Sequence, residues 1–182
     1  IQGRPVTALT ESSDGSFYFG GEHMYGNSIK FEFNYLKDPT VKINGMVFHM
    51  CSLWIGTNDG LYEINQRNFS LSKHHSTKNS KLPDPQINFL YSDQFDVLWV
   101  GTRKGVLRID GDTWKSYERQ SMEGIFENRE GLWLLSEDEL WNIDNIDKFN
   151  RWYRANLQEG LKKGKVNDIV IDSKDRLLIA SN

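Results

Sequence analysis

Cysteine and proline are scarce in this sequence, and its apolar residues never gather into a long run. The 182 residues include one cysteine and four prolines. Because Cys51 has no second cysteine to pair with, packing alone must stabilise the fold. No apolar run approaches the ~18 residues that a membrane span requires. We therefore expect contact with a membrane only through segments outside this sequence.

An excess of positive charge is also lacking, since 22 Lys and Arg residues stand against 25 Asp and Glu, a formal net charge of −3. Nucleic-acid-binding domains usually carry clustered positive charge, so we expect no nucleic-acid partner. The sequence does contain 38% hydrophobic and 13% aromatic residues, which excludes a disordered, collagen-like or coiled-coil chain. Its length predicts one domain or a piece of a larger one.

A phrase of five residues recurs along the chain. The clear copies are Leu53–Thr57 and Leu98–Thr102, Leu132–Ser136 departs from them, and Phe17–Gly21 and Leu177–Ser181 are weaker. The copies start at positions 17, 53, 98, 132 and 177, so their mean interval is 160/4 = 40 residues. A repeat of this length is typical of architectures that are built from one supersecondary unit.

Other apolar phrases surround each copy. One phrase precedes every copy by 10 or 11 residues, and a further phrase follows three copies. Alternating apolar, β-branched and aromatic residues predict short strands, and turn residues such as Asn58–Gly60 between them predict hairpins. The preceding phrases are Val6–Leu9, Ile43–Met46, Ile87–Leu90, Met122–Ile125 and Val166–Ile169, and the following ones are Gly60–Ile64, Gly105–Ile109 and Glu139–Ile143.

A unit of about 40 residues with three or four antiparallel strands predicts a propeller blade. We predict an all-β fold, a β-propeller, with about four and a half blades of a larger propeller and four short antiparallel strands in each blade. The expected blades span about residues 1–40, 41–82, 83–120 and 121–162, with an incomplete blade at 163–182. Residues beyond both ends are expected to complete the ring.

The recurring Trp and Gly residues are predicted to belong to the framework of the blades. A single blade cannot bury both faces of its sheet, whereas stacked blades can. Strand alternation sends Leu53 and Ile55 to one face and Trp54 to the other, so both faces are apolar and both need a neighbour. The residues assigned to this structural repeat are Trp54, Trp99, Trp133, Gly56 and Gly101.

With these phrases laid out, the chain resembles the two-component regulator propeller repeat family. The resemblance is best at residues 43–65 and 87–110, where Leu-Trp-Ile/Val-Gly-Thr is followed by Gly-Leu or Gly-Val. The resemblance implies a non-catalytic propeller from the periplasmic sensor region of a hybrid histidine kinase, in which a glycan or related polar ligand is sensed. It implies a membrane-anchored protein whose signalling module lies outside this sequence.

Several polar and aromatic residues lie outside the repeat. The segment Leu71–Gln86 predicts a surface connection, and Asn145–Lys165 predicts a short helix. No Cys, His or Asp spacing matches a metal site, so we expect no metal and no cofactor. His23, His49, His74 and His75 are interpreted as solvated loop residues, Cys51 as a small core or edge residue, and Tyr25, Trp114 and Trp152 as loop aromatics or interblade packing.

A polar residue follows the opening apolar position of each first strand. These residues, which would form a ring around the propeller axis, are Thr7, Asn44, Asn88, Glu123 and Asn167. Asn amides suit sugar hydroxyls, so Asn44, Asn88 and Asn167 are candidate ligand-binding residues; the alternative is that they satisfy local backbone groups. The turns between second and third strands should emerge on the same face, which adds Asn58, Asp59, Arg103 and Lys104 to the candidate site.

Three function classes remain open from the sequence. The first is a sensor propeller that binds an oligosaccharide. The second is an interaction scaffold, in which blade edges hold a partner or form a homodimer. The third is a propeller polysaccharide lyase or glycosidase, for which no catalytic residue can be assigned, because the sequence distance between acidic residues does not give their separation in space.

Overall fold

The computed structural model of the chain describes residues 5–29, 33–129, 131–136, 140–143, 166–172 and 177–181. All regular elements within these residues are strands, so this part of the chain contains no helix that could cross a membrane. The predicted helix at 145–165 lies outside the described residues. The chain divides into two compact units, residues 1–119 and 120–182, and each is considered by itself.

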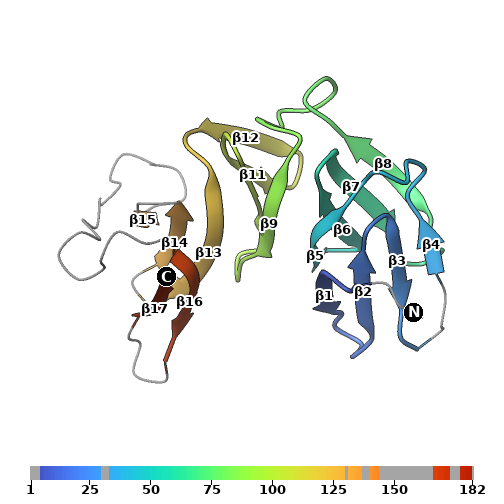
Figure 1. The fold of residues 1–182 in the computed structure, drawn as a ribbon, viewed down its shortest axis with the longest axis horizontal. Coiled ribbons are helices and arrows are strands. Elements are labelled where there is room, and N and C mark those ends of the chain that lie inside the picture. Colours follow the sequence, from blue (N-terminus) through green and yellow to red (C-terminus); the bar gives the residue numbers. More distant parts are fainter. Residues whose placement is uncertain are drawn as a thin grey trace. The chain divides into compact units, whose positions relative to one another are not determined.

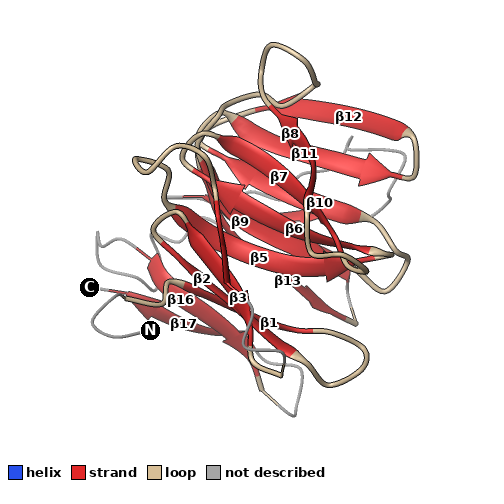
Figure 2. Cartoon of the chain, turned by 90° about the vertical axis from the view of Figure 1, so that its right-hand side faces the viewer, coloured by secondary structure: helices blue, strands red, loops and turns tan. Residues whose placement is uncertain are grey.

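The first unit contains three antiparallel sheets of four strands each, in simple up-and-down order (Figures 1 and 2). The strands are β1 (Ala8–Glu11), β2 (Phe17–Gly21), β3 (Met24–Asn27) and β4 (Phe33–Tyr35) in blade 1, β5 (Ile43–His49), β6 (Ser52–Thr57), β7 (Gly60–Asn65) and β8 (Leu71–His75) in blade 2, and β9 (Ile87–Ser92), β10 (Leu98–Thr102), β11 (Gly105–Asp110) and β12 (Thr113–Glu118) in blade 3.

The second unit contains two further antiparallel sheets. One is formed by β13 (Met122–Asn128), β14 (Gly131–Ser136) and β15 (Leu140–Ile143), and the other by β16 (Val166–Ile171) and β17 (Leu177–Ser181). Each sheet starts with the hairpin that the repeat predicts. The all-β propeller prediction is confirmed, with partial blades in this unit among the described residues.

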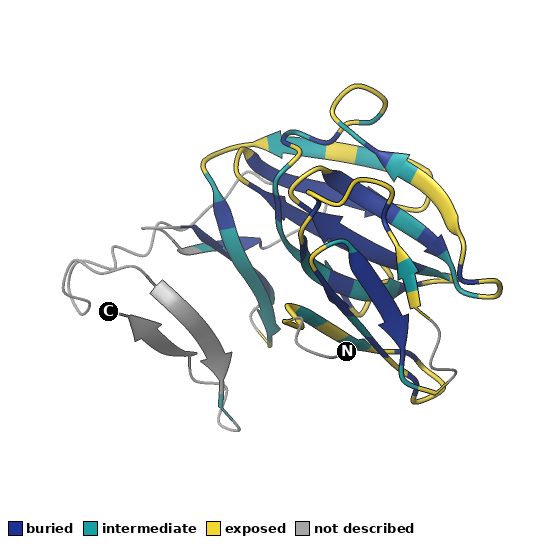
Figure 3. Cartoon of the chain, turned by 45° about the vertical axis from the view of Figure 1, so that its right-hand side comes forward, coloured by how far each residue is buried: buried dark blue, intermediate teal, exposed yellow. Residues whose placement is uncertain are grey.

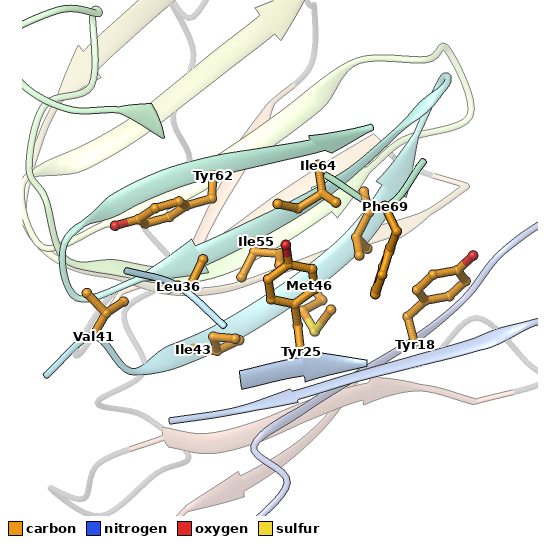
Figure 4. Packing of buried hydrophobic residues seen from close by; sticks show 11 residues of the cluster. Tyr18, Tyr25, Leu36, Val41, Ile43, Met46, Ile55, Tyr62, Ile64 and Phe69 are labelled. Carbon is orange, nitrogen blue, oxygen red and sulfur yellow. The ribbon is translucent and has the colours of Figure 1, made fainter. Parts of the chain in front are cut away.

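The blades of the first unit pack face to face. The first strands β1, β5 and β9 are successive neighbours, which is the innermost arrangement of a propeller. Leu53 and Ile55 are fully buried against Tyr18 and Tyr25 of blade 1 (Figure 4). Trp54 points to the opposite face and packs in a second cluster with Leu98 and other residues of blade 3. The predicted alternation is therefore confirmed.

Burial follows this arrangement. Figure 3 shows the central strands of the first unit as mostly buried and the turns as mostly exposed. Burial of apolar surface stabilises the folded state by about 25 cal/mol for each Å² removed from water. Stacking therefore stabilises every blade whose two sheet faces are both covered by neighbours. Blade 2 has both faces covered within this unit, by blade 1 on one side and blade 3 on the other.

The glycine of the repeat makes room for a neighbouring first strand. A Cβ atom added at Gly56 would lie 2.5 Å from Cγ2 of Ile87, which opens the next blade. At Gly101 an added Cβ would overlap the Phe89 ring, which lies across the sheet from it. The recurring glycine is therefore needed for close packing, as its assignment to the framework predicts.

The recurring tryptophan has a polar contact in two of the sheets. Trp99 is fully buried, and its Nε1 donates a hydrogen bond of 2.8 Å to Oδ2 of Asp93 in the β9–β10 turn. Trp133 donates in the same way to Oδ1 of Asn128, the last residue of β13, at 2.9 Å. Trp54 has no such acceptor, because His49 stands at the end of β5, in the position equivalent to Asn128, and contacts Ser92 instead.

Several sequence expectations were wrong. The segment 71–86 is not only a connection, because its first five residues form β8, the outer strand of blade 2. His49 lies on β5 and His75 on β8, and both are buried rather than solvated. The His49 ring contacts Ser92 and the His75 ring contacts Trp114, and both of these residues belong to blade 3. The two rings therefore fill space between blades 2 and 3.

Of the two interpretations given for Tyr25, interblade packing is correct, since it lies on β3 and is buried in the cluster between blades 1 and 2. Cys51 differs from expectation, because it is exposed in the tight turn between β5 and β6. Trp152 lies outside the described residues.

Candidate functional site

The starts of the first strands and the turns between second and third strands share one edge of the first unit. Ile43 pairs with Thr57, and Ile87 pairs with Thr102, so each first strand starts where its second strand ends. The backbone N–H of Lys42 also donates to Oδ1 of Asn58, at 2.6 Å. We call this surface the entry edge; it carries Asn44, Asn58, Asp59, Asp84, Asn88, Arg103 and Lys104.

The threonine of the repeat shapes the turns at the entry edge. Oγ1 of Thr57 donates to the Gly60 carbonyl at 2.8 Å and accepts from the Asp59 N–H at 2.9 Å. Thr102 makes the equivalent contacts, donating to the Gly105 carbonyl at 2.9 Å and accepting from the Lys104 N–H at 3.2 Å. Both threonines are fully buried, so the exposed residues between them and the glycines are held in one conformation.

The polar residue near the start of four of the first strands, β5, β9, β13 and β16, is a β-bulge. Pairing passes from Ile43 to Gly45, from Ile87 to Phe89, from Met122 to Gly124 and from Val166 to Asp168, and skips the residue between. The skipped residues are Asn44, Asn88, Glu123 and Asn167. A bulge removes a residue from the ladder and redirects its side chain. The sequence indicated the repetition of this position but not the bulge.

The side chains of Asn44 and Thr7 connect neighbouring blades. Nδ2 of Asn44 donates to the Ile87 carbonyl at 2.9 Å. Oγ1 of Thr7, at the equivalent position of blade 1, donates to the Ile43 carbonyl at 2.6 Å. Asn44 therefore satisfies a backbone group, as the alternative to ligand binding expected, but this group belongs to the next blade and is not a local one. The amide keeps further hydrogen-bonding capacity. The part played by Asn88 and Asn167 in ligand binding stays a prediction.

Charged groups of both signs lie on the entry edge. Nζ of Lys104 is 3.8 Å from Oδ2 of Asp84, whose side chain is largely buried while the lysine is largely exposed. Arg103 is exposed next to it. In the turn of blade 2, the Tyr62 hydroxyl donates to Oδ2 of Asp59 at 3.3 Å. Burial and, after it, the negative charge of Asp59 raise the pKa of Tyr62 to about 12.

His74 completes the turn of blade 2. Its Nε2 donates to the Asp59 carbonyl at 2.6 Å, and its ring stacks on Tyr62 with 4.1 Å between centroids. The structure thus brings Asn58, Asp59, Arg103 and Lys104 to the edge predicted for them, and it adds Asp84 and His74, which sequence analysis did not select. Nothing in the sequence spacing linked either residue to these turns.

A second feature, absent from the sequence predictions, is a cleft of about 530 Å³ at the outer strands of blades 2 and 3. Figure 1 shows the green segment that follows β8 projecting near this edge. We call this feature the outer cleft. It is lined by Lys73, His75, Lys78, Asn79, Ser80, Lys81 and Trp114. The signal for it in the sequence was a lysine-rich segment, which by itself resembles an ordinary solvated loop.

Aromatic rings form the inner wall of the outer cleft. His75 stacks on Trp54 with centroids 5.5 Å apart, and the Trp114 ring of blade 3 lies 4.7 Å from the His75 ring. His75 is 4% exposed, and its Nε2 makes no hydrogen bond, although Oε2 of Glu63 lies 3.5 Å away. Burial lowers the pKa of His75 despite that carboxylate.

Within the described part of the chain, no group of three or more His, Cys, Asp or Glu side chains could hold a metal ion. The acidic residues Glu137–Glu139 and Asp175 lie outside the described residues. The chemistry available in the first unit is therefore that of amides, lysine and arginine cations, single carboxylates and aromatic faces, which suits noncovalent recognition of a polar ligand.

Comparison with known proteins places this geometry among propellers. No protein-family model matches the chain, and no curated protein matches it significantly. The extracellular domain of hybrid two-component system BT3049 from B. thetaiotaomicron matches with 19% identity and a TM-score of 0.78, over 97% of this chain and 26% of that one. This chain thus spans about a quarter of that domain.

Two other solved structures show the same fold in different settings. Virginiamycin B lyase from Staphylococcus aureus matches with 13% identity and a TM-score of 0.73, over 99% of this chain and 71% of the lyase. YCF48 bound to D1 peptide matches with 12% identity and a TM-score of 0.67, over 98% of this chain and 62% of that one. At these identities the similarity establishes the β-propeller fold alone.

Proposed function

We propose that the chain is a non-catalytic recognition segment of an extracytoplasmic sensor propeller, which binds a glycan or related polar ligand and relays that event to a signalling module. The observation that carries the proposal is the similarity to the BT3049 extracellular domain over nearly the whole chain. The repeat phrases support it independently, because they resemble the propeller repeat of two-component regulators. In this proposal the protein is membrane-anchored and faces the periplasm.

The entry edge is the ligand site in this proposal. Its turns are fixed by Thr57 and Thr102, so exposed polar groups are presented without a large ordering cost on binding. Arg103 and Lys104 supply cations, Asn58 supplies an amide, and Asp59 supplies a carboxylate, a mixture that suits a polar and anionic sugar better than an apolar ligand.

The test is a double substitution, Arg103→Ala with Lys104→Ala, in the protein. Calorimetric titration with a panel of neutral and acidic oligosaccharides should give at least one ligand whose affinity falls in the double variant. Folding should be almost unchanged, since exposed turn substitutions usually shift stability by less than about 0.5 kcal/mol.

The matched control is Arg67→Ala, which removes a cation from the exposed turn between β7 and β8 at the opposite edge. It should leave affinity unaltered. Unaltered affinity in the double variant as well would place the ligand elsewhere, and a panel without any ligand would remove the sugar version of the proposal.

The YCF48 complex favours one second candidate, an interaction scaffold that holds a peptide or a second copy of the chain. Light scattering with and without ligand separates the two ideas, because a protein that stays monomeric throughout does not act through a homodimer.

The lyase relationship can be tested by incubating the protein with quinupristin, a compound bound in one of the lyase structures. We expect mass spectrometry to recover quinupristin unchanged.

A further inference from the structure

We propose that the outer cleft is a second binding site, separate from the entry edge, for the acidic unit of a saccharide that carries a carboxylate or sulfate group. The inference rests on the proposed recognition function and adds to it a chemical class and a place. It combines three observations on the described residues: a set of cations without partners, an aromatic wall, and a rigid polar rim.

The cations are Lys73, Lys78 and Lys81. All three are exposed and line the cleft. None of them forms an ion pair or side-chain hydrogen bond within the described residues, in contrast to Lys104, which lies beside Asp84. No acidic residue lines the cleft. Three like charges around one concave surface raise the local concentration of anions and attract a charged ligand.

The aromatic wall is provided by Trp114. This residue is half-buried: one part of its ring packs on His75 and Trp54, and the ring also borders the cleft. Tryptophan combines an apolar ring face with a polar N–H at its edge. The fixed, apolar face of the indole ring can therefore pack against the C–H face of a sugar ring. Because β12 and β8 belong to different blades, the wall exists only when blades 2 and 3 are packed together.

The polar rim is held by its own hydrogen bonds. The Ser76 N–H donates to Oδ1 of Asn79 at 2.7 Å, Nδ2 of Asn79 donates to the His74 carbonyl at 2.9 Å, and the Ser80 hydroxyl donates to the Ser76 carbonyl at 2.7 Å. This network fixes the backbone of the segment that carries Lys78 and Lys81, so the two lysine side chains extend from defined backbone positions.

One buried polar atom also borders the cleft. Nε2 of His75 makes no hydrogen bond, although Oε2 of Glu63 lies 3.5 Å away from it. A hydroxyl of a bound sugar can satisfy such a nitrogen whichever tautomer is present. The cleft volume of about 530 Å³ falls in the range of pockets for small ligands, about 300–1,000 Å³.

The experiment is a calorimetric titration of the protein with three probes: a tetramer of galacturonic acid, a sulfated disaccharide and neutral maltotetraose. The test variant combines Lys73→Gln, Lys78→Gln and Lys81→Gln. The control combines Lys37→Gln, Arg67→Gln and Arg129→Gln, which removes three exposed cations from other places. The two charged probes distinguish carboxylate from sulfate as the recognised group.

We expect a charged probe to bind, maltotetraose to bind more weakly, and the test variant to lose about tenfold or more in affinity, as the loss of charge-assisted contacts implies. The control variant should bind like the parent. If no charged probe binds, or if the test variant binds like the parent, the inference is wrong. If binding falls only in the Arg103→Ala and Lys104→Ala variant, the recognition function stands and the outer cleft has no part in it.

Discussion

Asp93 illustrates how one buried carboxylate organises a hairpin of the propeller. Its Oδ1 accepts the N–H groups of Phe95 and Val97, both at 2.9 Å, and its Oδ2 accepts Nε1 of Trp99. Asp14 accepts from the Ser16 N–H and from the Ser12 hydroxyl in the equivalent turn of blade 1, and these hydrogen bonds lower its pKa to about 2. In both turns a carboxylate thus acts as the acceptor for the turn amides.

Asp93→Ala should destabilise the protein by about 2–4 kcal/mol, because it leaves a buried indole N–H and turn amides without an acceptor. Asp93→Asn keeps one acceptor oxygen and should cost less. Denaturant unfolding measures both values. A loss below about 1 kcal/mol for the alanine variant would contradict the role given to Asp93.

Stability should also fall at mildly acidic pH because of two buried histidines. Burial lowers the pKa of His49 and of His75, even though Asp93 and Asp96 face the first and Glu63 the second. Each histidine binds a proton in the unfolded chain below about pH 6.5 before it does so in the folded one. The stability it contributes is complete above that pH and is lost as the pH falls below it.

The free energy of unfolding should therefore decline between pH 6.5 and pH 5, by at most about 1.4 kcal/mol per pH unit for each histidine. Carboxylates with lowered pKa, such as Asp14 and Asp38, act only at lower pH. Urea unfolding across this range is the measurement, and His75→Phe should flatten the curve. A profile without slope in the parent protein would show that neither histidine matters.

Residue identities at special backbone positions were the hardest to predict. The sequence indicated a polar residue at each first strand, but it could not reveal that Asn44 and Asn88 are bulges, because a bulge depends on the register of the partner strand. His75 was mistaken for a solvated residue because Ser and Lys surround it in the chain, while the ring is covered by Trp114 from another blade.

At the scale of the strand, alternation of side chains predicted the packing correctly. Leu53 and Ile55 contact blade 1, and Trp54 contacts blade 3, as a period of two residues requires. The four strands predicted for blade 2 are present, but β8 was not located within residues 71–86, because its residues Ser72–His75 are polar and the strand is mostly exposed, as outer strands at a sheet edge usually are.

Trp54→Ala and Trp99→Ala should each destabilise the protein by about 3–5 kcal/mol, the usual cost of emptying a large buried aromatic site. Trp54 is 7% exposed and Trp99 is fully buried. Equilibrium denaturation supplies the comparison, with Phe95→Ala as a control because that ring is 62% exposed in a turn. Losses below about 1 kcal/mol at both tryptophans would refute their interblade assignment.

At the scale of the whole molecule, the repeat explains why one face of blade 1 is open. Leu9 and Phe17 are exposed, while the residues at equivalent positions of blade 2, Met46 and Leu53, are buried against blade 1. We expect a further blade of the same kind to cover that face, since an apolar sheet face needs a neighbour.

The sequence predicted the number and order of strands in this unit because each blade carries its own signal, whereas the outer cleft needs two blades and could not be foreseen.

The repeats are blades whose stability comes from packing on one another. The contact of Tyr18 on β2 with Phe48 on β5 crosses a blade boundary, with ring centroids 4.6 Å apart in an edge-to-face arrangement. A double-mutant cycle with Tyr18→Leu and Phe48→Leu, followed by denaturant unfolding, measures this contact directly. We predict a coupling energy of about 0.5–1.5 kcal/mol, the range for buried aromatic pairs. Two strictly additive substitutions would contradict face-to-face packing of blades 1 and 2.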